Sequence, residues 1–294
     1  MSLINLADML AVANQHKFAV GAFNAIDSNF IDAVFTAAQQ NQSPVIVNMA
    51  EVHLPYIDMY SASEYIKKKA ALANVPVCLN LDHGLTMPTI EKAIECGFSS
   101  IMFDGSHLSY EENITQTRKV AELCHQYGIS VEGELGAVGG DEGGALESLA
   151  DQALYTKVEQ AKEFVGETGI DALAVAIGNT HGKYKGEPKL DFERLQQIHQ
   201  AVDVPLVLHG GSGISAADFR KTIALGICKI NFFTGMSQAA LQSLEKDAGN
   251  AELIQKYNYY LLMMSNMQHA ISQTVAEQMD IFRSINKAEL YART

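Results

Sequence analysis

Short apolar runs recur along the chain and alternate with longer stretches of helical periodicity. The runs are almost continuously hydrophobic, which is typical of parallel strands that are covered on both faces. In the stretches between them, apolar residues return about every 3.6 positions, as on the buried face of an amphipathic helix. We count eight runs: FAVGAFNA (18–25), PVIVNMA (44–50), VPVCLNLD (75–82), SSIMFDG (99–105), SVEGELG (130–136), ALAVAIG (172–178), PLVLHG (205–210) and KINFFTG (229–235).

Eight strand–helix units in succession predict a (β/α)8 TIM barrel. A doubly wound open sheet is the alternative arrangement of the same units. We expect a single domain over residues 1–294, with a short amphipathic helix before the first strand. After the eighth strand the helical pattern continues, and residues 251–286 predict a C-terminal helical extension that packs on the barrel or on a partner subunit.

Charge and composition narrow the classes of function. The 294 residues carry a formal net charge of −13, from 34 acidic and 21 basic side chains. No basic stripe is visible, so we expect no nucleic-acid partner. No run of about 18 apolar residues is present, so we expect no membrane span. The four cysteines lie far apart and form no CxxC pair, which indicates reduced thiols in a cytoplasmic protein.

Three histidines near the ends of predicted strands are each followed by glycine: His83, His181 and His209. The carboxyl ends of barrel strands meet at one face, where active sites are assembled. Three imidazoles at one rim suit a catalytic zinc ion, which takes three protein ligands and keeps one position open. The alternative is that each histidine only bonds to loop backbone. His53 and His107 also follow strands, but neither precedes a glycine, so we leave them outside this site.

Glycine-rich turns follow the last two predicted strands, HGGSG at 209–213 and NFFTG at 231–235. Glycine lets backbone N–H groups approach an anion, and a helix N-terminus adds a favourable dipole. Phosphate sites in barrels often lie after strands seven and eight, so these turns predict a phosphate site. Another glycine-rich stretch, GGDEGG at 139–144, is either an exposed loop or a lid that carries Asp141 or Glu142 into the site as a base.

Taken in order, the motifs GAFNA, LDHG, FDGS, EGELG, the acidic glycine-rich loop, GNTHG, HGGSG and KIN..T resemble one known family. This is the class II, zinc-dependent fructose/tagatose-bisphosphate aldolase family, and the likeness is nearest to the tagatose-bisphosphate branch. It covers nearly the whole chain. It implies a lyase that cleaves a ketose 1-phosphate or ketose bisphosphate to dihydroxyacetone phosphate and an aldehyde. It also implies one catalytic zinc per chain, room for a monovalent cation, and a homodimer or homotetramer.

The resemblance also assigns roles to side chains at the strand ends. The three histidines would hold the zinc. Asp82 would be the acid/base at the cleaved carbinol, and Glu142 the base that handles the enediolate. Asp82 and its neighbour in the chain, His83, alternate sides of a strand, which would let them do different jobs in one site. Asp104 and Glu134 match acids at the metal centre. They would either bond to the metal ligands from behind or form an alternate metal position.

A further set of residues would hold the substrate. The glycine-rich turns would bind dihydroxyacetone phosphate, and an asparagine on the first strand would support the enediolate or the loop. The residues that the resemblance implies for these roles are Asn24, Gly182, Gly210, Gly211, Ser212, Asn231 and Thr234.

Departures from the family pattern concern the distal half of the substrate. Ala50 stands where relatives usually offer a serine hydroxyl, and Phe232 and Phe233 stand where small, aliphatic or acidic residues are usual. Relatives that take a second phosphate usually place Arg and Lys in the C-terminal helices, whereas residues 257–278 contain neither. We therefore predict an aldehyde partner without a phosphate.

Other functions stay open on the sequence alone. A non-catalytic sugar-phosphate-binding or regulatory subunit would keep the phosphate site but lose the acid/base pair, and Asp82 and Glu142 are both present. A metal-free barrel isomerase or synthase would not need three histidines. A lysine-dependent aldolase would need a reactive lysine at a strand end, and Lys229, just before Asn231, is the candidate.

Overall fold

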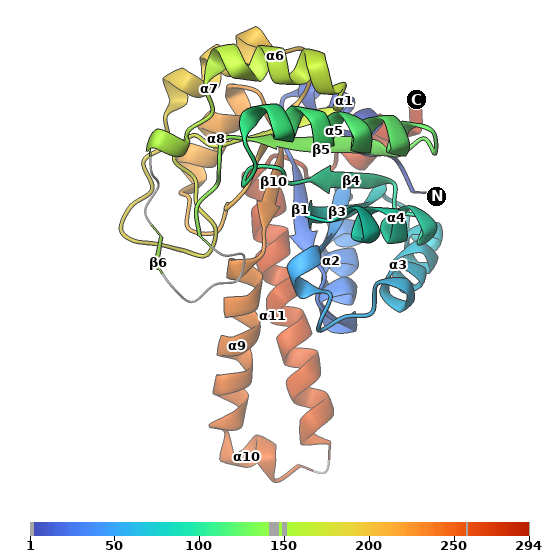
Figure 1. Ribbon diagram of the computed structural model, residues 1–294. Coiled ribbons are helices and arrows are strands. Elements are labelled where there is room, and N and C mark those ends of the chain that lie inside the picture. The colour runs from blue at the N-terminus through green and yellow to red at the C-terminus, as the bar shows by residue number, and fades with distance from the viewer. Residues whose placement is uncertain (1–2, 141–146, 149–151, 257, 294) are drawn as a thin grey trace.

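Eight parallel strands close into a barrel in the computed structural model (Figure 1), which describes residues 3–140, 147–148, 152–256 and 258–293. The order around the barrel is β1, β2, β3, β4, β5, β7, β9, β10, and β10 pairs back to β1. The predicted (β/α)8 barrel is thus confirmed, and every predicted apolar run overlaps one barrel strand, although β3 ends two residues after its run and β10 begins two residues before its run. The strands are β1 (Val20–Asn24), β2 (Val45–Ala50), β3 (Val77–Gly84), β4 (Ser100–Phe103), β5 (Ser130–Leu135), β7 (Ala172–Val175), β9 (Leu206–Leu208) and β10 (Ile227–Phe232).

The first helix, α1 (Leu6–His16), closes the end of the barrel at which the strands begin. Its residues Leu6, Met9 and Leu10 are fully buried in one cluster with side chains from the first halves of the strands. The opposite end, where the strands finish, is left to polar side chains. The fold therefore separates an apolar floor from a polar rim.

In the described residues, one helix follows each of the first seven barrel strands, and six of these seven helices begin at a side-chain cap that bonds to a backbone N–H of the first turn. Such caps satisfy amide groups that a helix start leaves unpaired. A second apolar cluster fills the layer between these helices and the barrel. The helices are α2 (Ser28–Gln40), α3 (Met59–Leu72), α4 (Met87–Glu95), α5 (Tyr110–His125), α6 (Val158–Thr168), α7 (Phe192–Ala201) and α8 (Ala216–Ala224).

The C-terminal region forms a two-helix arm that extends beyond the barrel (Figure 1). It consists of α9 (Thr234–Ala248), the short α10 (Ala251–Ile254) at its tip and the returning α11 (Tyr259–Ile281). The second half of α11 is anchored in the core, while Tyr260 and Leu261 at its start are exposed. In the described ranges, no helix is both long and apolar enough to cross a membrane.

Short elements complete the structure. A two-stranded parallel sheet of β6 (Glu147–Ser148) and β8 (Lys183–Tyr184) joins the loop after β5 to the loop after β7. Sequence reasoning did not predict it, because two-residue strands are too short to show a period. The 3-10 helices are η1 (Glu51–His53), η2 (Gln152–Leu154) and η3 (Ala288–Arg293). All four cysteines are free and buried.

Candidate active site

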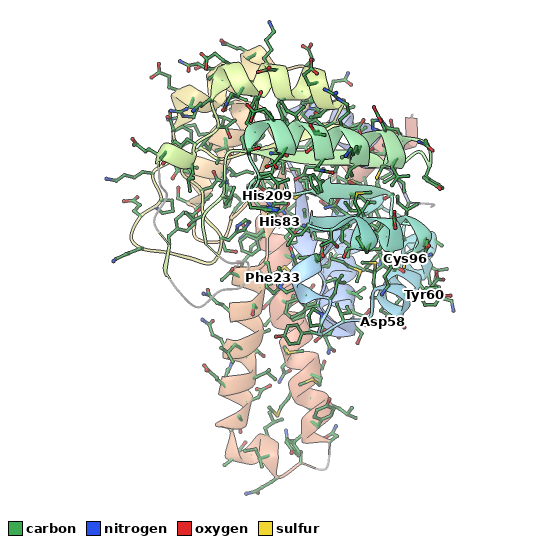
Figure 2. All side chains as sticks on the ribbon, viewed as in Figure 1. Asp58, Tyr60, His83, Cys96, His209 and Phe233 are labelled. Atoms are coloured by element: carbon green, nitrogen blue, oxygen red, sulfur yellow. The ribbon has the colours of Figure 1, made fainter. Side chains whose placement is uncertain are left out.

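The three histidines come from three strand ends and meet at the polar rim. His83 lies near the end of β3, His209 directly follows β9, and His181 lies in the loop after β7. The ring centroid of His83 lies 4.7 Å from that of His209 and 4.9 Å from that of His181, and the centroids of His181 and His209 are 5.8 Å apart. Figure 2 labels His83 and His209 next to each other. Each of the three residues is at least nine-tenths buried.

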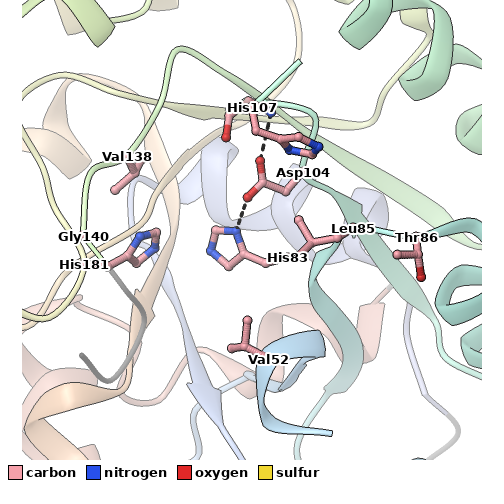
Figure 3. A pocket seen from close by; sticks show the side chains of 10 residues that line it. Val52, His83, Leu85, Thr86, Asp104, His107, Val138, Gly140 and His181 are labelled. Carbon is pink, nitrogen blue, oxygen red and sulfur yellow. Dashed lines mark hydrogen bonds and ion pairs between the residues drawn. The ribbon is translucent and has the colours of Figure 1, made fainter. Parts of the chain in front are cut away.

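Hydrogen bonds to carboxylates determine which ring nitrogen carries the proton in two of these histidines. His83 Nδ1 lies 2.7 Å from Asp104 Oδ2, a contact that Figure 3 shows, and His209 Nε2 lies 2.8 Å from Glu132 Oε1. Because an ionised carboxylate only accepts, these two ring nitrogens carry the protons. In the neutral rings the opposite nitrogens, His83 Nε2 and His209 Nδ1, would carry the lone pairs. They lie 3.0 Å apart, and the amide nitrogen of Asn231 lies 3.1 Å from His209 Nδ1.

Facing lone pairs and an unpaired third ring fit a metal ion. His181 Nε2 is buried and has no hydrogen-bond partner among the described residues. One ligand atom from each of the three histidines lies within 4.8 Å of the others. Three imidazole ligands are the donor set of open catalytic zinc sites. The residues present therefore fit the zinc that the resemblance implied.

The protonation of these rings agrees with metal binding. Burial lowers the pKa of His181 and of His209 well below the ordinary value. Both rings are therefore neutral near pH 7, the form that can ligate a metal.

Asp82 lies beneath the histidines and is fully buried. Its carboxylate accepts hydrogen bonds from Asn231 Nδ2 at 2.8 Å and from Asn24 Nδ2 at 3.3 Å. Burial raises the pKa of Asp82, but the neighbouring basic groups, His83, His209 and Lys229, outweigh this effect and hold the pKa below the ordinary value. Asp82 is thus an ionised carboxylate that can accept a proton at neutral pH.

A backbone irregularity brings Asp82 and His83 into the same site. His83 has a φ of 44°, in the left-handed region, and the register between β3 and β4 shifts between Leu81 and Gly84. Simple strand alternation, which we expected from the sequence, would point neighbouring side chains to opposite faces. The bulge re-aims one of them, as bulges near active sites commonly do.

Two further carboxylates stand beside His83, where the resemblance expected acids. Asp104 accepts from the backbone N–H of Ser106 at 3.0 Å as well as from His83. Glu134 Oε1 accepts from the Val138 N–H at 3.2 Å, and its Oε2 lies 3.9 Å from His83 Nδ1. Burial, together with the charge of Asp104, raises the pKa of Glu134 well above its ordinary value. His83, Asp104 and Glu134 form a second group that could hold a metal.

A buried ion pair that sequence reasoning did not assign lies behind His209. Lys229 Nζ is 2.6 Å from Glu132 Oε2, and both side chains are fully buried. The ammonium is therefore engaged and is poorly placed as a Schiff-base nucleophile. Charged residues inside apolar strands were the available signal, because such groups are rarely fully buried unless they are paired.

The expected phosphate-binding residues gather after β9 and β10. Gly210 has a φ of 64°, and a Cβ there would meet the Thr180 carbonyl oxygen at 2.1 Å. The Gly211 N–H donates to the Asn231 carbonyl at 3.1 Å, so this amide is engaged within the protein. Ser212 Oγ accepts from the Gly235 N–H at 3.0 Å, which ties the two turns together.

Two members of that set lie at the edges of the turns. Thr234 is the first residue of α9, so the N-terminus of that helix adjoins the HGGSG turn. Gly182 is buried directly after His181 and has a φ of 76°. A helix N-terminus next to glycine-rich turns is a favourable position for an anion.

A cavity of about 530 Å³ opens beside the histidines (Figure 3). Among the described residues that line it, none is Lys or Arg. His107, which we had left outside the site, belongs to the wall. The lining residues are Val52, His83, Leu85, Thr86, Asp104, Ser106, His107, Val138, Gly140 and His181.

The three positions that depart from the family pattern are all buried. Ala50 is inaccessible, and Phe232 packs edge-on against Phe23 rather than lining the cavity. Phe233 lies against the ring of His53, with a centroid distance of 4.8 Å. Both phenylalanines therefore belong to the core and add little exposed surface at the rim.

The acidic glycine-rich loop begins at the cavity, since Gly140 lines it and Gly139 forms a β-bridge with Thr180. Asp141 and Glu142 lie outside the described residues, so the assignment of Glu142 as a base stays a prediction.

Comparisons with known proteins agree with these features. The family model described as fructose-bisphosphate aldolase class-II matches residues 4–287. The probable fructose-bisphosphate aldolase of Bacillus subtilis is 38% identical over 292 residues, which cover 98% of this chain and 100% of that protein. Fructose-bisphosphate aldolase of Staphylococcus aureus is 37% identical with the same coverage. The crystal structure of the YdjI aldolase from Escherichia coli K12 has a TM-score of 0.85 at 34% identity, over 97% of this chain and 99% of that one.

Proposed function

Because the chain belongs to the class II fructose-bisphosphate aldolase family, we propose that it cleaves a ketose 1-phosphate whose aldehyde half carries no phosphate. Members of this family are lyases that release dihydroxyacetone phosphate by aldol cleavage, which sets aside the isomerase and the non-catalytic binding protein considered above. The assignment to the tagatose branch stays a suggestion of the sequence. Our proposal concerns the substrate and the roles of individual residues.

We propose zinc as the ion held by His83, His181 and His209. The close approach of His83 Nε2 and His209 Nδ1, 3.0 Å apart, is the observation that carries this proposal. A zinc ion bound there would supply the Lewis acidity that polarises the ketone oxygen and stabilises the charge left after cleavage. A monovalent cation is a further prediction of the family resemblance.

Asp82 would accept the proton of the hydroxyl on the bond that breaks. As that proton leaves, the carbinol carbon becomes an aldehyde, and the bonding electrons pass to the dihydroxyacetone phosphate half as an enediolate. Asn24 and Asn231 donate to Asp82 and so hold its carboxylate in place. Glu142 would then protonate the enediolate carbon, and both roles reverse in synthesis.

The phosphate of the dihydroxyacetone half would lie in the turns at 209–213 and 231–235, next to the start of α9. The aldehyde half would extend into the cavity lined by Thr86, Ser106 and His107. These side chains can bond to hydroxyl groups, but they supply no fixed positive charge. A second phosphate would bring about two negative charges into a protein that already carries −13.

The substrate proposal is tested by kcat/KM for matched ketose 1-phosphates that differ only in a distal phosphate. We expect the substrate without the distal phosphate to be preferred. A tenfold preference for the bisphosphate, about 1.4 kcal/mol of transition-state binding, would contradict the proposal. It would point to a basic residue from another loop, such as Lys183 or Lys185, or from a partner subunit.

The arm of α9 and α11 supports a homo-oligomer. Tyr260, Leu261 and Leu241 expose large apolar side chains on it, and a two-helix hairpin gains stability when such surface is covered. We propose a homodimer or homotetramer in the cytoplasm, where the four free cysteines would stay reduced. Light scattering of the purified protein would measure the number of subunits, and a monomer would contradict this part of the proposal.

A further inference from the structure

A chain of three buried groups runs from the barrel interior to the histidine cluster. Lys229 Nζ lies 2.6 Å from Glu132 Oε2, and Glu132 Oε1 lies 2.8 Å from His209 Nε2. All three side chains are fully buried. The aldolase roles assigned above use His209 as a ligand, but they give no role to Lys229 or Glu132.

The direction of each hydrogen bond in this chain is forced. An ammonium group has three donors and no acceptor, so Lys229 can only donate to Glu132. An ionised carboxylate has no donor, so Glu132 can only accept from His209. The proton of neutral His209 must then be on Nε2, and the lone pair must be on Nδ1, the atom that lies 3.0 Å from His83 Nε2.

We propose that Lys229 and Glu132 are positioning residues that lock His209 in the tautomer required for zinc binding. This inference rests on the proposed zinc site. Glu132 selects the tautomer directly, and Lys229 acts through Glu132 by occupying Oε2 and compensating a charge that would be costly to bury alone. The pair therefore serves the metal site rather than only the stability of the barrel.

His83 gives a contrast within the same site. It also bonds to a carboxylate, but Asp104 lies at the open cavity and is held by the backbone N–H of Ser106. Among the described residues, His209 alone of the three histidines has a carboxylate partner that is itself paired with a buried ammonium. Its ligand geometry should therefore depend on a residue that does not itself touch the metal ligand, namely Lys229.

An amide at position 132 makes the proposal testable. In Glu132→Gln, Lys229 should attract the amide oxygen, so the amide NH2 should face His209 Nε2. A donor there favours the wrong tautomer and removes the lone pair from Nδ1. In Lys229→Met/Glu132→Gln the amide is free to turn and accept from His209. Adding Lys229→Met to Glu132→Gln should therefore restore part of the zinc affinity that Glu132→Gln alone loses.

The experiment measures the zinc dissociation constant of the folded full-length protein by competition with a chromophoric chelator at one fixed neutral pH. Absorption spectra of the Co²⁺ forms report ligand geometry independently of activity. Glu132→Gln should weaken zinc binding by roughly 10–100-fold, as losses of outer-shell partners do. Lys229→Met/Glu132→Gln should bind zinc more tightly than Glu132→Gln alone. Asn80→Ala, which removes a buried hydrogen bond to Asn48 elsewhere in the barrel, should stay near the wild type.

The proposal can still be tested if one of the variants fails to fold. If Glu132→Gln fails to fold, Lys229→Met/Glu132→Gln is compared with Lys229→Met/Glu132→Leu, which has no acceptor, and the Gln variant should bind zinc more tightly. Wild-type affinity in Glu132→Gln, equal affinity in the two double variants, or an equal loss in Asn80→Ala would overturn the inference. If the wild type itself binds no zinc, the proposed function fails instead.

Discussion

Asp82 is the residue for which the structure makes the sharpest functional prediction. Its carboxylate accepts hydrogen bonds from the amides of Asn24 and Asn231, and an asparagine in its place would keep the shape but could not accept a proton. We expect Asp82→Asn to keep its fold and its zinc and to lose at least about 10²-fold in the rate of carbon–carbon cleavage. Steady-state cleavage rates, with zinc content as the control, measure this effect. A wild-type rate would show that Asp82 only supports the ligands.

Individual residues show where reasoning from sequence ends. The three histidines could be identified because each combines a strand end with a following glycine. The bulge at His83 could not, since nothing in LDHG distinguishes a regular strand from one with a left-handed residue. Glu132 and Lys229 were visible as charges in apolar strands, but their pairing depends on contacts between residues 97 positions apart.

At the level of elements, the glycines of the turn after β9 are predicted to be needed for its shape. Gly210 and Gly128 both have positive φ, but only at Gly210 would a Cβ meet backbone, whereas at Gly128 nothing lies within 4 Å. We expect Gly128→Ala to cost about 1–2 kcal/mol of stability and to leave activity unchanged. Gly210→Ala should cost more stability and should also reduce kcat/KM at least tenfold, since small misplacements near a site are costly.

Urea unfolding and kinetics on the two glycine variants separate these effects. If Gly210→Ala is as active and as stable as Gly128→Ala, the turn is more adaptable than its contacts with Thr180 indicate.

The loop after β5 carries a prediction of its own. Glu142→Ala should slow exchange of the enediolate-forming proton of dihydroxyacetone phosphate with deuterium, followed by NMR, because this residue would handle that proton. Asp82→Asn should affect the exchange less, since Asp82 acts on the other half of the substrate. Unchanged exchange in Glu142→Ala would move the role to Asp141.

Element prediction succeeded where the pattern was long and failed where it was short. Each barrel strand overlaps one apolar run, and the helices between them follow the apolar period. The sheet of β6 and β8 was missed, because its pairing is set by the packing of two loops rather than by a local pattern. The burial of Phe232 and Phe233 could not be predicted, because the side of a strand end that a residue faces depends on the barrel's register.

Across the whole molecule, an apolar floor closed by α1 lies opposite a polar rim that gathers three histidines and four carboxylates. The barrel and the meeting of the three histidines could be predicted from the sequence, because strand order fixes which ends meet. The residues of the cavity wall could not be predicted from the sequence, because His107 and Thr86 are brought together by loops whose shape no periodicity encodes.

Zinc titration into the chelated protein tests whether this is a zinc-dependent aldolase. We expect chelation to abolish release of dihydroxyacetone phosphate from a ketose 1-phosphate while the barrel stays folded by circular dichroism. Activity should return in proportion to added zinc and level off at about one ion per chain, as a site with three protein ligands requires. His209→Ala should bind zinc weakly and stay inactive throughout the titration. Full activity in the metal-free protein would contradict the account.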